Sequence, residues 1–271
     1  MFWRTYVNMK KIYIYGNNFP YIEELKKDWN IVDCAENSDV IVSYGGDGTL
    51  LETMHIANGI PIIPIRNYAL CGQHEPFNCI NFARIISNNE FEKYTNIVKI
   101  NNLKTFIDGK MVGDAFSEVC IRNINSRNAI RFDVFVNDLT YVKDIIGDGI
   151  IVATSYGSTG YFRSITRTMF KHGVGLAFNN PTQPTTNIIT DEMSNFSIKI
   201  KRCGANVQID NVENKSFNIN ENSTVEIKMS NDNTANILFL GQFMCTHCRE
   251  KRHGGIECLY NFGDFLYKDW Q

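Results

Sequence analysis

The sequence predicts a mixed α/β protein in two parts, and two observations lead to this prediction. In the first hundred residues, short apolar runs alternate with segments of helical character, which is typical of a parallel sheet covered on both faces. After about residue 100, helical periodicity becomes scarce, and short segments are separated by turn pairs such as Asp-Gly. We therefore expect an α/β domain at 1–102 and a β-rich domain at 103–246, with 247–271 packing back on the first domain.

The first domain is expected to alternate between the two kinds of element. The predicted order is strand 11–15, helix 22–29, strand 40–43, helix 50–57 and strand 60–65. This order makes the N-terminal domain a Rossmann-like parallel α/β domain. In such sheets ligands bind beyond the carboxyl ends of the strands, so a ligand is expected where the second strand ends.

The second domain is expected to be predominantly β and sandwich-like. Residues 196–201 alternate apolar and polar side chains, as half-buried strands do. Further short strands are expected at 105–108, 116–122, 130–136, 141–146 and 225–229.

The composition narrows the functional classes. The 271 residues are 44% hydrophobic and 21% charged, with a net charge of -2 and a pI near 6.2. A dedicated nucleic-acid binder would carry a basic surface, so nucleic acid is not an expected partner. No apolar run approaches the roughly 18 to 20 residues of a membrane span, and residues 1–8 do not resemble a signal peptide. We expect a cytoplasmic protein that does not enter the membrane.

A glycine-rich turn, Tyr-Gly-Gly-Asp-Gly-Thr-Leu-Leu at 44–51, joins the second strand to the second helix. Free backbone N–H groups and the positive end of a helix dipole suit a phosphate at such a turn. The carboxylate of Asp47 is repelled there unless it holds a metal or takes a proton from an incoming hydroxyl. The alternative is a tight turn in which Asp47 and Thr49 cap the helix.

A second glycine cluster lies at 147–161, within the β-rich part. An Asp-Gly turn leads into an apolar strand, then a loop of Ser, Thr and Gly, and then a helix from Tyr161. Small hydroxyl side chains and glycines let a phosphate or a ribose approach the backbone closely. The alternative is a hydroxyl-capped helix start.

The two clusters together resemble the NAD kinase family. Residues 38–51 carry its G-G-D-G-T turn, and 147–161 follow its G-D-G to G-S-T-A-Y segment. Ala-Phe-Ser-Glu-Val at 115–119 stands where the family usually has A-L-N-E-V, and Ile-Asp-Asn at 209–211 stands for its I-D-G. The ending, 258–266, is also similar, so the resemblance spans most of the chain.

The resemblance implies phosphoryl transfer from ATP, or in some members polyphosphate, to the 2'-hydroxyl of the adenosine ribose of NAD, giving NADP. Mg²⁺ would neutralise much of the phosphate charge, and Asp47 would accept the hydroxyl proton as the catalytic residue. Ser117 and Glu118 would bind ribose and nicotinamide-side groups. The adenosine half is often held across a subunit interface, which implies a homodimer or homotetramer. The implied binding residues are Gly45, Gly46, Gly48, Thr49, Ser117, Glu118, Asp148, Thr159, Gly160, Tyr161 and Ser164.

Several positions depart from the family pattern. Ser117 replaces Asn, Gly160 replaces Ala, and Ile146 stands where many members have Arg. The glycine pair after the Tyr helix is absent near 166–167, and only the outline of a further motif remains at 64–72. These departures indicate a divergent branch, such as an archaeal-type member. Two alternatives stay open: an NAD(P)-binding relative with altered catalysis, and a lipid kinase of the diacylglycerol kinase type, which shares the G-G-D-G-T turn.

Three cysteines and a histidine near the C-terminus have the spacing C-x2-C-x4-H-x4-C, formed by Cys245, Cys248, His253 and Cys258. Three thiolates and one imidazole form an established structural zinc set. The alternative is coincidence in a chain with eight cysteines, and the family resemblance predicts no zinc here. Structural Zn²⁺ is therefore a hypothesis beside the expected Mg²⁺.

Overall fold

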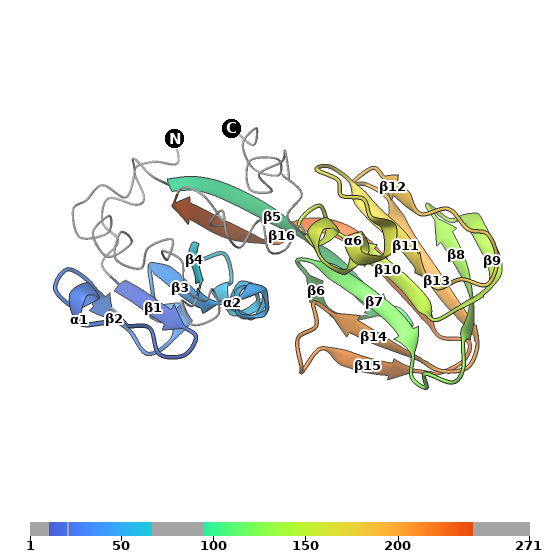
Figure 1. Ribbon diagram of the computed structural model, residues 1–271, viewed down its shortest axis with the longest axis horizontal. Coiled ribbons are helices and arrows are strands. Elements are labelled where there is room, and N and C mark those ends of the chain that lie inside the picture. The colour runs from blue at the N-terminus through green and yellow to red at the C-terminus, as the bar shows by residue number, and fades with distance from the viewer. Residues whose placement is uncertain (1–10, 21, 67–94, 241–271) are drawn as a thin grey trace. The chain divides into compact units, whose positions relative to one another are not determined.

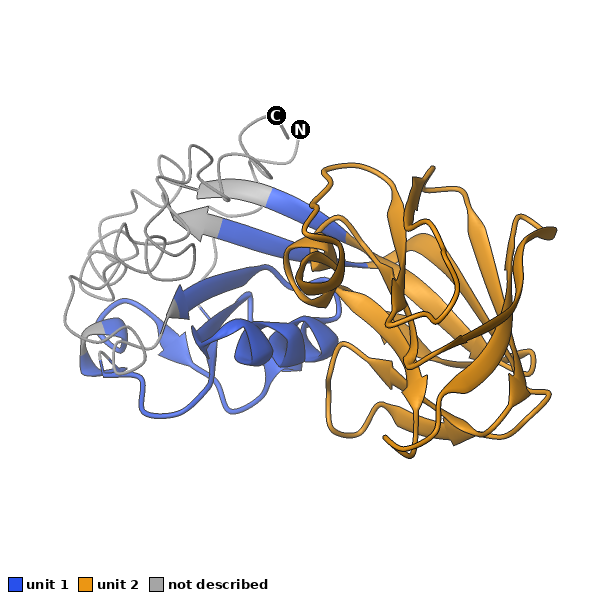
Figure 2. Cartoon of the chain, turned by 45° about the vertical axis from the view of Figure 1, so that its right-hand side comes forward, with its two compact units in different colours: residues 1–100, 234–271 blue, residues 101–233 orange. Residues whose placement is uncertain are grey.

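A computed structural model describes residues 11–20, 22–66 and 95–240. The chain divides into two compact units, residues 1–100 with 234–271 and residues 101–233 (Figure 2). Two long strands, β5 (Thr95–Ile107) and β16 (Thr224–Leu240), each contribute residues to both units. The segment 247–271, expected to pack on the first domain, lies outside the described residues.

The first unit contains a parallel sheet with the strand order β2-β1-β3-β4-β16 (Figure 1). Its central strand β3 (Val40–Gly45) is almost wholly buried, so its continuous apolar run is the expected pattern for a strand covered on both faces. The parallel α/β prediction for this part is confirmed. The other strands are β1 (Lys11–Tyr15), β2 (Asn30–Ile31) and β4 (Ile62–Arg66).

The two helices predicted for the first unit have other bounds in the structure. Helix α1 (Ile22–Leu25) is shorter than predicted, and the chain after it continues in turns, with the Trp29 N–H donating to the Leu25 carbonyl at 2.8 Å. Helix α2 (Asp47–Ala57) begins three residues earlier than the predicted residue 50. Its C-cap is Asn58, whose φ of 45° is left-handed, as is common just after a helix. A short 3-10 helix, η2 (Ala35–Asn37), precedes β3.

The second unit is built from two facing β-sheets. In one sheet β16 is followed by β13, β8 and β9; β5 also pairs with β16, and β6 pairs with β5. The other sheet is antiparallel, with the order β12-β11-β10-β7-β14-β15. The strand bounds are β6 (Lys110–Ala115), β7 (Glu118–Asn123), β8 (Ile130–Val136), β9 (Leu139–Gly147), β10 (Gly149–Ala153), β11 (Val174–Asn179), β12 (Ile188–Thr190), β13 (Asn195–Arg202), β14 (Ala205–Ile209) and β15 (Ser216–Ile219).

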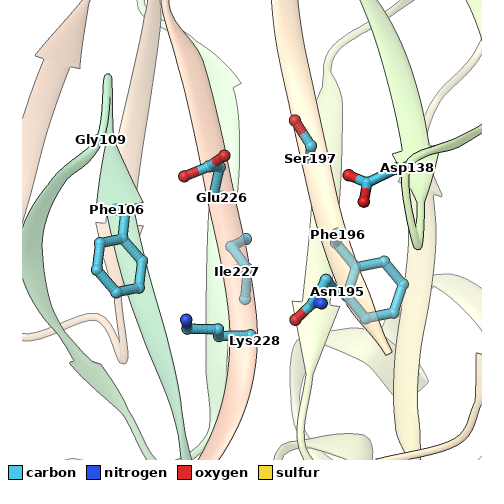
Figure 3. Close-up of a pocket in the computed structure, with 9 residues that line it drawn as sticks. All are labelled: Phe106, Gly109, Asp138, Asn195, Phe196, Ser197, Glu226, Ile227 and Lys228. Atoms are coloured by element: carbon cyan, nitrogen blue, oxygen red, sulfur yellow. The ribbon is translucent and has the colours of Figure 1, made fainter. Parts of the chain in front are cut away.

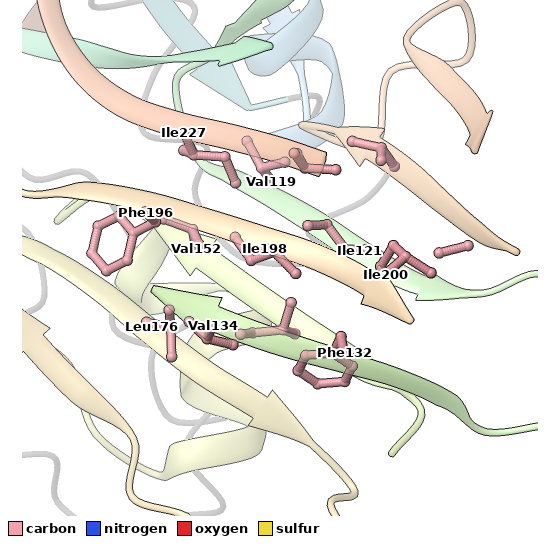
Figure 4. Packing of buried hydrophobic residues seen from close by; sticks show 14 of the residues in the cluster. Val119, Ile121, Phe132, Val134, Val152, Leu176, Phe196, Ile198, Ile200 and Ile227 are labelled. Carbon is pink, nitrogen blue, oxygen red and sulfur yellow. The ribbon is translucent and has the colours of Figure 1, made fainter. Parts of the chain in front are cut away.

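The core of the second unit lies between these sheets (Figure 4). Phe132 and Phe196 come from one sheet and Ile121 and Leu176 from the other, and all four are fully buried. Full burial of such side chains contributes about 1.5 to 3 kcal/mol each. This packing makes the unit a β-sandwich, as predicted.

The outer face of the second sheet is covered by helix α6 (Tyr161–Thr166), which follows the 3-10 helix η3 (Gly157–Thr159). Phe162 of α6 packs with Phe170, Cys120 and Ile151 in a separate apolar cluster. The helix begins at Tyr161, as the sequence predicted. Among the described residues, no helix is both long and apolar enough to cross a membrane.

Candidate functional site

The glycine turn of the first unit leads directly from β3 into α2. Gly46 is the N-cap of α2 in an extended conformation and makes no side-chain cap bond. Asp47 is the first helical residue, and its side chain is exposed. The alternative in which Asp47 or Thr49 is the N-cap is therefore wrong. The Asp47 carboxylate therefore lies at the solvent-exposed first turn of the helix.

The three glycines of this turn meet different surroundings. A Cβ atom on Gly45 would overlap the Thr49 side chain, lying 2.6 Å from its Cβ, so packing within the chain requires glycine there. Among the residues that the structure describes, a Cβ atom on Gly46 or on Gly48 would meet nothing within 4 Å. The packing of these described residues therefore does not explain Gly46 and Gly48. Close approach of a ligand to the first N–H groups of α2 would explain them.

Helix α2 is fixed on the sheet by side-chain hydrogen bonds. The buried hydroxyl of Thr53 lies 2.9 Å from Ser43 Oγ on β3 and 2.7 Å from the Thr49 carbonyl. On β1, the Tyr15 hydroxyl donates to Glu52 Oε2 at 3.1 Å. These bonds hold the start of the helix, and with it Asp47, in one orientation relative to the strands of its unit.

A second group of predicted residues surrounds the turn between β6 and β7. The Asp210 carboxylate, only 2% exposed, accepts hydrogen bonds from three consecutive backbone N–H groups. The donors are those of Phe116 at 2.6 Å, Ser117 at 2.7 Å and Glu118 at 3.0 Å. In return, the Asp210 N–H donates to the Glu118 carbonyl at 3.0 Å. Asp210 therefore holds the turn that carries Ser117 and Glu118 through three backbone N–H groups and one backbone carbonyl.

The Glu118 carboxyl is partly buried, and Ser117 Oγ donates a hydrogen bond to its Oε2. Burial raises the pKa of Glu118 to about 7, the Ser117 hydrogen bond lowers it, and the nearby Asp210 charge raises it. Glu118 therefore changes its protonation near neutral pH and can either donate or accept a hydrogen bond.

The Ser/Thr/Gly loop after β10 packs against the same turn. Thr154 Oγ1 lies 2.7 Å from the Phe116 carbonyl and 3.1 Å from that of Ser117, and it accepts the Gly157 N–H at 3.1 Å. A Cβ atom on Gly157 would overlap the Ser117 carbonyl, so only glycine fits. At Gly160 a Cβ atom would lie 3.6 Å from Glu118 Oε2, which is an ordinary contact. The structure thus brings Ser117, Glu118 and Gly160 together.

The remaining predicted side chains of the second unit make hydrogen bonds within that unit. Asp148 accepts hydrogen bonds from Asn123 at 3.4 Å and Asn180 at 3.1 Å. The Tyr161 hydroxyl accepts one from Asn179 at 3.1 Å, and Arg122 lies 5.8 Å from the Tyr161 ring centroid. The hydroxyls of Thr159 and Ser164 donate to the backbone carbonyls of Tyr156 and Tyr161.

Sequence reasoning identified Asp210 and Thr154 as parts of motifs but not as site residues, and it missed Arg122. Asp210 could have been singled out because its motif accompanies the Ser-Glu motif. Its bonds to 116–118 depend on the pairing of β14 with β7, which places Ile209 opposite Val119.

A groove with a volume of about 320 Å³ lies elsewhere on the second unit, on the outer side of the sheet that contains β13 and β16 (Figure 3). Lys228 Nζ lies 5.2 Å from the ring centroid of Phe106 at this groove. No predicted site residue lines it. It is therefore separate from the residues described above.

The zinc hypothesis and the magnesium hypothesis concern different residues. The cysteines and histidine of the zinc spacing, Cys245, Cys248, His253 and Cys258, lie outside the described residues. Within the described part of the chain, no group of three or more His, Cys, Asp or Glu side chains could hold a metal ion. Mg²⁺ does not require such a group, because it is usually held by one or two carboxylates together with substrate phosphates and waters. Asp47 fits that arrangement.

Comparison with known proteins shows sequence similarity to NAD kinases. No protein family model matches the chain. A bifunctional NADP phosphatase/NAD kinase of Methanococcus maripaludis is 33% identical over 147 residues, which cover 51% of this chain and 25% of that protein. The NAD kinase of Sulfurisphaera tokodaii is 26% identical over 211 residues, covering 72% of this chain and 79% of that protein. The matched region thus spans about a quarter of the length of the bifunctional relative.

Solved structures have the same fold. A crystal structure of yeast NADH kinase complexed with NADH has a TM-score of 0.72 at 12% identity and covers 93% of this chain and 89% of that one. An NAD kinase from Archaeoglobus fulgidus in complex with ATP has a TM-score of 0.65 at 19% identity, covering 90% of this chain and 98% of that one. At these identities the likeness establishes the fold.

Proposed function

We propose that the chain is a member of the NAD kinase family and that it phosphorylates the 2'-hydroxyl of the adenosine ribose of NAD to give NADP; the sequence similarity to NAD kinases supports this proposal. The Archaeoglobus fulgidus structure contains ATP, which supports ATP as the phosphoryl donor. The observation that carries the proposal is the exposed Asp47 carboxylate between Gly46 and Gly48, whose Cβ positions are open.

Asp47 would act as the proton acceptor in this reaction. As the ribose oxygen attacks the terminal phosphorus of the donor, its proton passes to the Asp47 carboxylate. The bonds from Thr53 to Ser43 on β3 and from Tyr15 on β1 to Glu52 keep the helix that carries Asp47 in place. Positioning of this kind accounts for much of the catalysis of phosphoryl transfer.

The phosphates would lie over the first turn of α2. The N–H groups of this turn have no partner within the helix, and the helix dipole favours negative charge there. Because Gly46 and Gly48 carry no side chains, a phosphate oxygen can reach these N–H groups directly. Mg²⁺, held by Asp47 and the phosphates, would supply charge neutralisation when bound.

In the second unit, we propose that the NAD ribose and the nicotinamide side bind at Ser117 and Glu118. Carboxylates commonly accept hydrogen bonds from the hydroxyls of a ribose. The adenosine half would bind at Asp148, Gly160 and Tyr161, together with Thr159 and Ser164. The resemblance supports these roles and also supports a homodimer or homotetramer.

The test is a coupled assay in which NADP formed from NAD, ATP and Mg²⁺ is consumed by an NADP-specific dehydrogenase. Asp47→Asn should lower kcat by about 10²- to 10⁴-fold, the range for loss of a general base. The matched control is Asp28→Asn, another exposed aspartate in the same unit. Equal loss in both variants would contradict a special role for Asp47.

Further arms of the assay separate the alternatives. Polyphosphate in place of ATP, and NADH in place of NAD, define the donor and the acceptor. Phosphorylation of diacylglycerol but not NAD would refute the proposal in favour of a lipid kinase. Tight NAD binding without NADP formation from any donor would indicate a binding protein rather than an enzyme.

A further inference from the structure

We propose that Asp210 is the positioning residue for Glu118, holding the backbone of the 116–118 turn so that the Glu118 carboxyl is presented to NAD. This inference rests on the proposed function, because it assigns to NAD the ligand that Glu118 meets. Asp210 is not itself placed against the substrate, since it is only 2% exposed and its carboxylate accepts backbone N–H groups.

Asp210 holds the turn with hydrogen bonds in both directions. Its Oδ2 accepts the Phe116 N–H, and its Oδ1 accepts those of Ser117 and Glu118. Its own N–H returns a bond to the Glu118 carbonyl at 3.0 Å. A buried carboxylate with several backbone donors is a strong, charge-assisted anchor. Four hydrogen bonds therefore join Asp210 to three consecutive residues.

The backbone around Asp210 is shaped for this task. Asp210 and Asn211 have φ values of 51° and 53°, in the left-handed region that Asp and Asn tolerate better than most residues. Two such residues in succession turn the chain sharply at the end of β14. Asp and Asn therefore suit this turn better than a branched residue would.

Thr154 holds the opposite side of the turn through the carbonyls of Phe116 and Ser117. With its N–H groups bound by Asp210 and these carbonyls bound by Thr154, the turn has little freedom to shift. Glu118 Oε2 meets Ser117 Oγ and lies close to Gly160. The position of the Glu118 carboxyl is thus determined by Asp210 and Thr154, which hold the turn from its two sides.

The charge of Asp210 also acts on Glu118. It raises the pKa of the Glu118 carboxyl, adding to the effect of burial. Cys120 and Arg122 follow on the same strand, and Lys215 lies on the segment before β15. Burial lowers the pKa of Lys215, while the charge of Asp210 raises it. Because the charge of Asp210 raises the pKa of Glu118, removing that charge should lower this pKa.

The experiment measures NAD affinity by calorimetry between pH 5.5 and 8.5 and the Glu118 carboxyl titration by ¹³C NMR without ligand. In Asp210→Asn, we expect about tenfold weaker NAD binding, since one charge-assisted acceptor is lost, and a Glu118 midpoint at lower pH. Glu118→Gln should abolish the pH dependence that Glu118 gives to NAD affinity. Asp133→Asn is the matched control, because Asp133 is another buried carboxylate that accepts one backbone N–H, that of Asp144, at 2.8 Å.

Asp210→Glu keeps the charge and moves the carboxylate by one methylene. In this variant NAD binding should weaken, but the Glu118 midpoint should not move to lower pH as it does in Asp210→Asn. This variant carries the test if Asp210→Asn does not fold. Wild-type NAD affinity and an unchanged Glu118 midpoint in either folded variant of Asp210 would overturn the inference. Absence of NAD binding by the wild-type chain would overturn the proposed function, and this inference with it.

Discussion

Replacing Glu118 by Gln should stabilise the protein increasingly as the pH rises from 5 to 8. The pKa of Glu118 is raised from 4.5 to about 7 in the folded chain. Between these values the folded state binds more protons than the unfolded state, so the stability contributed by this carboxyl is present below pH 4.5 and is lost as the pH rises through 7. Glutamine has the shape of the protonated carboxyl and does not titrate.

The magnitude follows from the size of the shift. One pKa unit corresponds to 1.36 kcal/mol, so the full effect is at most about 3 kcal/mol, of which about 2 to 3 kcal/mol should develop between pH 5 and pH 8. Urea unfolding of wild type and Glu118→Gln at pH 5.0, 6.5 and 8.0 measures the difference in free energy of unfolding. Glu226→Gln, at an exposed carboxyl of β16, is the control and should show no such trend.

A difference between wild type and Glu118→Gln that stays constant with pH would refute the reasoning. It would mean that water or a rearranged Ser117 keeps the carboxylate solvated in the folded chain. A difference that grows with pH in Glu226→Gln as well would mean that net charge, rather than burial of Glu118, causes the trend.

Three further predictions test the two predicted ligand-binding regions. Gly48→Ala should raise the free energy of unfolding by up to about 1 kcal/mol in urea, because alanine favours helix, yet slow NADP formation, because its methyl group enters the space assigned to phosphate. Gly157→Ala should instead destabilise by about 2 to 3 kcal/mol, since its Cβ would overlap the Ser117 carbonyl. Thr154→Val should cost about 1 to 3 kcal/mol by leaving the Gly157 N–H without its acceptor. Unfolding curves equal to wild type in Gly157→Ala or Thr154→Val would contradict the contacts described for these residues. NADP formation at the wild-type rate in Gly48→Ala would contradict the space assigned to phosphate.

Local patterns were sufficient to predict much of the first unit. The buried run of β3 and the start of α6 at Tyr161 follow from apolar spacing and glycine punctuation, which act over a few residues. The length of β16 could not be predicted in this way. Its polar stretch around residues 230–236 has little strand propensity, but hydrogen bonds to residues distant in sequence hold it: Asn102 Nδ2 donates to the Asn233 carbonyl at 3.0 Å, and Asn236 Nδ2 donates to the Gly59 carbonyl at 2.7 Å.

The same distinction applies to the site. The 45–49 turn could be recognised because its glycines and its aspartate are contiguous. The motif that contains Asp210 could be recognised, but its role as the anchor of Glu118 could not, because Asp210 is 92 residues away in sequence and reaches Glu118 only through the register of β14 on β7. Sequence reasoning therefore found the residues that would face a ligand, and it missed the residue that holds one of them in place.

The departures from the NAD kinase pattern are not equivalent in the structure. Asn211, in place of the usual Gly, has a φ of 53°, which asparagine tolerates. At Gly160 the space for an alanine Cβ remains, 3.6 Å from Glu118 Oε2. Ser117 differs from both, because its hydroxyl bonds to Glu118 and lowers the pKa of that carboxyl against the effect of burial. The divergence of this chain therefore has its chemical consequence at the Glu118 carboxyl, where an asparagine amide would offer a ligand a donor that serine directs to its neighbour.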